Sequence, residues 1–224
     1  MYEIKNSKQV ELSDRVRFRC IRCGKCCRNV HGSVIVESLD GYKMAKHLGI
    51  TVADFYDKYT DLFFMEDVEF PIFALKTTGE ENACIFLKSN CCTIQDAKPR
   101  TCKMYPFWIG PGKTPEDFTY NLSTEQRHHP KGSLVKVKDW MHDNFTDEEK
   151  RFLDEDYKAM TEIAPLYNIV HKALKDNDSL LRIVIMWRYL FFETDELFFP
   201  QFERNNGLLK DELTRVIKLN ISIG

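Results

Sequence analysis

The spacing of apolar residues changes along the chain, and it predicts extended segments in the first half and helices in the second. Residues 15–19, RVRFR, alternate basic and apolar side chains, which is the pattern of a short strand. Residues 33–37, SVIVE, are rich in β-branched side chains and are also expected to be extended. Residues 70–95, FPIFALKTTGEENACIFLKSNCCTIQ, read as two or three short strands joined by polar turns, so we expect β-hairpins there.

Helices are predicted where capping residues precede or follow apolar side chains at helical spacing. Ser38 is the predicted N-cap of a helix that ends at Gly49. Thr51 is the predicted N-cap of a second helix, over residues 52–64. In the second half, the capping box Thr146–Glu149 predicts a helix to about residue 163. Further helices are expected from Ser179 and over residues 208–219.

Between these regions, residues 99–107 predict a turn or short helix that Pro106 ends, and residues 109–118 a loop. The expected fold is therefore α+β and mostly helical. It consists of a cysteine-rich metal-binding domain with short β-hairpins, residues 1–135, and a helical region packed on it, residues 136–224.

Composition places the chain among ordinary folded proteins and narrows its partners. Hydrophobic residues make up 43% and charged residues 29% of the 224 positions, and the net charge is -2. A nucleic-acid partner is therefore not expected. The expected partner is a protein or a small molecule of unspecified kind. The N-terminus has no apolar signal segment, and the densest apolar run, IVIMWRYLFF, is too short for a membrane span, so we expect a cytoplasmic protein.

A reducing cytoplasm makes the cysteines the most informative residues, because clustered thiols there more often bind metal or do redox chemistry than form disulfides. All eight lie in the first half, and four of them fall within eight positions, as Cys20, Cys23, Cys26 and Cys27. Gly24 can take the positive φ that a loop reversing around a metal requires.

Two kinds of metal site fit the cysteine spacing. Zinc takes four thiolates or imidazoles, and a Cys-x2-Cys pair commonly supplies two of them. A [4Fe-4S] cluster takes four cysteines, and Cys-x2-Cys-x2-Cys with one distant cysteine satisfies it. Unligated, buried cysteine is the remaining interpretation.

Basic residues recur every third position through the same loop, at Arg19, Arg22, Lys25 and Arg28. Four thiolates around a divalent centre leave a net negative site, which adjacent cations would offset. A solvated basic surface explains the same residues equally well.

The segments CIRCGKCC, CIFL and CTIQDAKPRTCKMYP, taken in order, resemble the YkgJ-type CxxCxxCC cysteine-cluster family. Its members are described as candidate zinc- or iron-chelating proteins, and flagellin lysine N-methylases carry a similar cluster. The resemblance covers roughly residues 17–132. It implies metal ligation by the residues that fall on the family's cysteines: Cys20, Cys23, Cys26, Cys27, Cys84, Cys92 and Cys102.

The sequence departs from the family pattern at several positions. Cys91 is an additional cysteine, and Lys98, Gln95 and Lys103 replace the family's Arg, Tyr and Arg. The family often has a later cysteine where this chain has His129, in HHPKGS. Imidazole can replace thiolate on zinc and in some iron–sulfur clusters, so His129 is either an eighth ligand or an ordinary loop histidine.

The leading hypothesis is a protein that holds an iron–sulfur cluster through these residues, and the resemblance also allows a redox or methyl-transfer enzyme. The alternative is a zinc-stabilised structural or interaction module without catalysis. No phosphate-binding loop, nucleophile elbow or zinc-protease motif is present, so no catalytic residue is assigned and the question of catalysis stays open. The aromatic run MWRYLFFETDELFFPQF is expected to be helix-packing core rather than a cofactor site.

Overall fold

The structure is a computed structural model of the chain. It describes residues 7–20, 23–65, 69–111, 118–124, 133–174 and 177–221. Short antiparallel strands concentrate in the first half and helices in the second, which confirms the α+β prediction.

The chain forms two compact units, each built from two separate segments. Unit 1 contains residues 1–30 and 77–154, and unit 2 contains residues 31–76 and 155–224. The boundary that we predict between residues 135 and 136 divides the chain into consecutive parts, and it stays a prediction.

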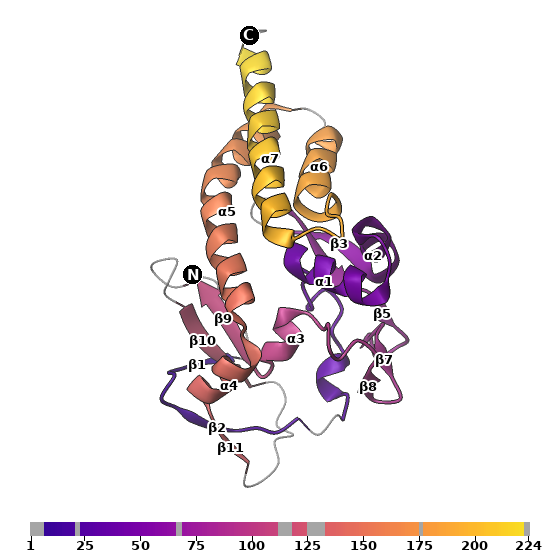
Figure 1. Ribbon diagram of the computed structural model, residues 1–224, viewed down its shortest axis with the longest axis vertical. Coiled ribbons are helices and arrows are strands. Elements are labelled where there is room, and N and C mark those ends of the chain that lie inside the picture. Colours follow the sequence, from indigo (N-terminus) through magenta and orange to yellow (C-terminus); the bar gives the residue numbers. More distant parts are fainter. Residues whose placement is uncertain are drawn as a thin grey trace. The chain divides into compact units, whose positions relative to one another are not determined.

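Antiparallel strands form one side of unit 1 (Figure 1). A three-stranded sheet has the order β1 (Ser7–Val10), β10 (Phe118–Ser123), β9 (Phe107–Pro111). A separate ribbon pairs β2 (Arg15–Arg17) with β11 (Leu134–Lys136), which confirms the strand predicted at RVRFR.

The loop predicted over residues 109–118 is wrong at both ends, because they belong to β9 and β10. Gly110 pairs with Thr119, and a Cβ on this glycine would lie 2.8 Å from the Thr119 hydroxyl oxygen. The glycine therefore serves close strand packing here and does not mark a turn.

Helices cover the sheet residues of unit 1 and complete its core. They are α3 (Arg100–Met104), α4 (Val137–Asn144) and the first turns of α5 (Asp147–Ala173). Their apolar side chains join those of the strands in one buried cluster: Val10, Met104, Phe107, Val137, Met141 and Phe145.

Two small hairpins complete unit 1, as the pattern of residues 70–95 predicts. One pairs β5 (Thr77–Thr78) with β6 (Ala83–Cys84), and the other pairs β7 (Leu87–Lys88) with β8 (Cys91–Cys92). These strands are only two residues long, so turn residues rather than ladder bonds hold their shape.

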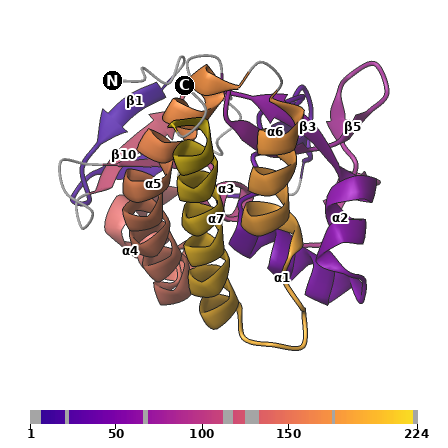
Figure 2. The same ribbon diagram turned by 90° about the horizontal axis from the view of Figure 1, so that it is seen from above.

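Unit 2 combines helices with one strand pair. Its elements within the described residues are α1 (Ser38–Leu48), α2 (Val52–Tyr59), β3 (Thr60–Phe64), β4 (Pro71–Leu75), the rest of α5, α6 (Asp178–Ile185), the π-helical turn η2 (Met186–Leu190) and α7 (Phe198–Ile221). Both views place α7 between α5 and α6 (Figures 1 and 2). Their facing side chains form the core of the unit: Ile163, Tyr167, Val170, Leu180, Val184, Leu209 and Leu213, with Phe70.

One of the three predicted caps in these regions needs correction, and so does one predicted helix start. Thr51 accepts a hydrogen bond from the Asp54 amide at 3.0 Å and Gly49 ends α1 in the left-handed region, as predicted. Ser38, however, already lies in the first turn of α1, after Glu37 as N-cap. Helix α6 begins at Asp178, with Asn177 as N-cap, one residue before the predicted start at Ser179.

Three predicted helix ends are also wrong. The helix of residues 52–64 stops at Tyr59, because residues 60–64 pair with β4 as strand β3. Helix α5 continues past residue 163 through Pro165, since the buried residues beyond it hold the helix despite the lost hydrogen bond. Helix α7 begins at Phe198 rather than residue 208, with Pro200 in its first turn, where no amide donor is needed.

The aromatic run of residues 186–202 packs in part as predicted, because three of its phenylalanines are buried whereas Phe191 and Leu197 are exposed. Phe198 stacks against both Phe192 and Phe202 at 5.1 and 5.4 Å between ring centroids, and all three side chains are buried. Among the described helices, none has a stretch long and apolar enough to cross a membrane.

Candidate metal centre

The cysteine loop turns tightly at Gly24, which has φ of 70° and precedes a single 3-10 turn, Lys25–Cys27. The Cys27 amide donates to the Gly24 carbonyl at 3.1 Å. A Cβ at residue 24 would lie 2.6 Å from Nη1 of Arg28. Both the left-handed backbone and the close contact therefore require glycine here, as the sequence predicts.

The hairpins carry the next cysteines. Cys84 ends β6, and Cys92 ends β8 opposite Leu87. The turns before them contain left-handed residues, at Asn82 (φ 44°) and Asn90 (φ 62°), a conformation that asparagine tolerates.

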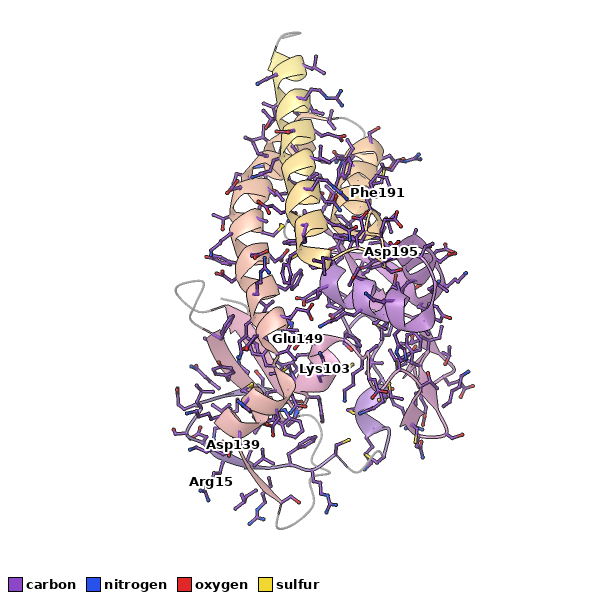
Figure 3. The ribbon with its side chains drawn as sticks, viewed as in Figure 1. Arg15, Lys103, Asp139, Glu149, Phe191 and Asp195 are labelled. Atoms are coloured by element: carbon purple, nitrogen blue, oxygen red, sulfur yellow. The ribbon has the colours of Figure 1, made fainter. Side chains whose placement is uncertain are left out.

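Helix α3 carries Cys102. The Cys102 amide donates to the Pro99 carbonyl at 2.9 Å, so the proline sets the start of the helix. The next residue, Lys103, forms an ion pair with the buried carboxylate of Glu149 at the start of α5, and the two lie side by side in Figure 3. Trp140 donates to the Met104 carbonyl at 3.1 Å. Helix α3 is thus fixed by two contacts, the ion pair of Lys103 and the hydrogen bond from Trp140.

Four thiols from these three segments lie in one neighbourhood. Burial raises the pKa of the Cys102 thiol, and charge at Cys84, Cys26 and Cys92 raises it further. Burial likewise raises the pKa of the Cys84 thiol, with a further contribution from Cys92 and Cys26. Because one charge shifts the pKa of another only at short range, Cys26, Cys84, Cys92 and Cys102 form a cluster, which we name the thiol cluster.

Cys27 adjoins this cluster through its neighbour in sequence. The sulfur atoms of Cys26 and Cys27 lie 3.9 Å apart. This contact and burial raise the pKa of the Cys26 thiol well above its ordinary value. All eight cysteines are free thiols.

The remaining cysteines differ in their exposure to solvent. Cys20 and the additional Cys91 are exposed, Cys23 is half-buried, and His129 falls outside the described residues. As the side chains stand, no three or more Cys, His, Asp or Glu groups within the described ranges are close enough to hold a metal ion. The thiol cluster is therefore a set of neighbouring donors that must converge further to bind a metal.

Lys98 is the cation that influences the thiol cluster, and the sequence did not identify it as such. Lys98 lowers the pKa of both Cys26 and Cys102, in opposition to burial. Its only sequence signal is the position where the resembled family has arginine. Of the four loop cations, Arg28 is engaged by Glu81 and Asn90, Lys25 is exposed, and Arg22 lies outside the described residues.

Comparison with known proteins gives one family. Its profile, CxxCxxCC, described as "Putative zinc- or iron-chelating domain", matches residues 19–132. The matched range contains all eight cysteines and His129. No curated protein and no solved structure matches the chain. Since the profile covers half of the sequence, the chain belongs to the CxxCxxCC family.

Proposed function

We propose that unit 1 binds a metal centre through the thiol cluster, Cys26, Cys84, Cys92 and Cys102. The observation that supports this most is that Cys84, Cys26 and Cys92 all raise the pKa of the Cys102 thiol, and that Cys92 and Cys26 also raise the pKa of Cys84. Four is the number of thiolates that both zinc and a [4Fe-4S] cluster take.

The chemistry of the donors fits a metal. Gathering four thiols of which only Cys84 is fully buried gains little from packing alone, and the raised pKa values of Cys84 and Cys102 mean that free thiolates are disfavoured there. A bound cation reverses this, because a coordinating thiol is deprotonated outright. Lys98 then offsets part of the negative charge that four thiolates leave.

The remaining predicted ligands, Cys20, Cys23, Cys27 and His129, make a second set of four. We propose that they contribute to an adjoining site, with Cys26 and Cys27 directed to different centres. This arrangement uses every cysteine of the family pattern once and leaves Cys91 without a role in binding.

The first candidate for the metal is iron in an iron–sulfur cluster. A [4Fe-4S] cluster takes four cysteine thiolates, and the thiol cluster supplies four, from Cys26, Cys84, Cys92 and Cys102.

Zinc is the second candidate, and one distance favours it. Two thiolates bound tetrahedrally to one zinc ion at about 2.3 Å lie about 3.8 Å apart. The sulfur atoms of Cys26 and Cys27 are separated by 3.9 Å. Under this alternative both residues bind the same ion, and the site stabilises the fold without catalysis.

Protein purified without oxygen separates the two metals. An iron–sulfur protein shows broad visible absorption, and contains iron and acid-labile sulfide in equal amounts. A colourless protein with zinc and no sulfide supports the alternative. Protein that carries neither metal, and takes up neither after reconstitution, contradicts the proposal.

A further inference from the structure

We infer that Arg28 is a positioning residue that fastens the cysteine loop to the two hairpins and thereby preorganises the metal site. The inference rests on the proposed function, since it assigns how that site is held together. Arg28 follows Cys27 directly, so its side chain starts from the loop itself.

The guanidinium uses all three of its nitrogen atoms. Nη1 donates to the Gly24 carbonyl at 2.9 Å, within the loop. Nε donates to the Glu81 carboxylate at 2.8 Å, and Nη2 donates to the Asn90 side-chain oxygen at 2.7 Å. One side chain therefore connects the loop to both hairpin turns.

Its two hairpin partners flank the cysteines that the proposal uses. Glu81 lies three residues before Cys84, and Asn90 lies two residues before Cys92. The backbone reinforces the same junction, because the Asn29 amide donates to the Glu81 carbonyl at 2.8 Å. Fixing these turns fixes where the hairpin thiols lie relative to Cys26.

This contact geometry depends on arginine. The planar fork presents donors in three directions, whereas lysine has a single ammonium group at the end of a flexible chain. Gly24 leaves the room that the fork occupies, since a Cβ there would lie 2.6 Å from Nη1. The side chain of Arg28 is only 29% exposed, so these contacts are partly shielded from water.

A simpler explanation is that any cation in the loop stabilises nearby thiolates. Lys25 distinguishes the two explanations, because it lies in the same loop, is exposed, and its side chain forms no hydrogen bond or ion pair with the described residues. If charge alone matters, removing either cation weakens metal binding equally. If position matters, only the change at Arg28 does.

The test titrates apoprotein with cobalt(II), whose thiolate charge-transfer absorption reports Co–S bonds whichever metal the protein holds natively. We expect Arg28→Gln and Arg28→Lys to bind cobalt about 10–100-fold more weakly than the unaltered protein, the range seen when a residue supporting a ligand is lost. The absorption per bound cobalt should also fall, because the hairpin thiols no longer converge with Cys26. Lys25→Gln is the matched control, and its affinity should stay within about twofold.

Should Arg28→Gln not fold, Glu81→Gln and Asn90→Ala each remove one contact and should each give a smaller loss of the same kind. Equal weakening by Lys25→Gln and Arg28→Gln would overturn the inference, and so would normal binding by Arg28→Lys. If the unaltered protein binds cobalt and the Arg28 variants bind it equally well, this inference fails alone. If the unaltered protein shows no Co–S absorption, the proposed function fails with it.

Discussion

At the scale of single residues, Arg28 and Lys98 carry the same charge near the same thiols and act differently. Arg28 donates hydrogen bonds to Glu81 and Asn90, and the Glu81 carboxylate largely compensates its positive charge. Lys98 instead lowers the pKa of Cys26 and Cys102. A sequence shows that both are basic, but which one faces the thiols depends on how Pro99 orients the start of α3.

His129 is the residue at which a single substitution is most informative. If its imidazole replaces the family's cysteine, His129→Ala should weaken metal binding by at least about 10–100-fold, the loss seen even for residues that only support a ligand. His129→Cys should retain the metal, because thiolate binds the same metals. Metal content per chain, measured after gel filtration, gives the answer.

His128→Ala is the control, one position away and expected to bind metal normally. Normal metal content in His129→Ala would mean that His129 is an ordinary loop histidine.

At the scale of elements, the sequence predicts best the caps that neighbouring residues form with one another. The capping box at Thr146 and Glu149 and the cap at Thr51 appear where predicted, because each depends on bonds between residues three apart. The ends of α5 and α2 depend instead on distant partners, the core of unit 2 and strand β4. Strands β9 and β10 were missed because Gly110 and Pro111 are residue types typical of a loop, whereas here they pair with Thr119 and Phe118.

The junction of α3 and α5 gives a prediction about pH. Burial would raise the pKa of Glu149, but hydrogen bonds from Lys103 and Thr146 outweigh it, and the pKa lies below its ordinary value. A carboxylate with a lowered pKa stabilises the fold above the unfolded-state value of about 4.3, and this contribution is lost as pH falls through the lower folded-state value.

We therefore expect Glu149→Gln to lower the free energy of unfolding by about 1–3 kcal/mol at neutral pH. The difference from the unaltered protein should shrink below about pH 4, because there the unaltered carboxyl also becomes neutral. Urea unfolding at several pH values measures it. Lys150→Gln, which removes a surface pair with Asp147 in the same helix, should show no comparable loss at any pH. A loss for Glu149→Gln that is constant down to pH 2 would contradict the role of its charge.

At the scale of the whole molecule, the two units are each built from segments separated in sequence, yet the cysteines are not shared between them. All eight belong to unit 1. Unit 2 contributes a core of apolar and aromatic side chains and a buried arginine, Arg188, paired with Asp156 and Asn206. The CxxCxxCC profile and its cysteines could be identified from the sequence, because the motif is local. The division of each unit into two segments separated in sequence could not be predicted, because it depends on which apolar side chains pack together within each unit.

The central claim is that the thiol cluster binds the metal, and one comparison tests it most directly: the metal content of the unaltered protein, Cys102→Ser and Cys91→Ser, each purified without oxygen. Cys102 is in the cluster, whereas Cys91 is exposed and outside the family pattern. We predict full metal content for the unaltered protein and Cys91→Ser, and for Cys102→Ser the loss of the metal that the thiol cluster holds, with circular dichroism confirming that each protein is folded. Full metal content in a folded Cys102→Ser protein, or loss of metal from Cys91→Ser alone, would contradict the account.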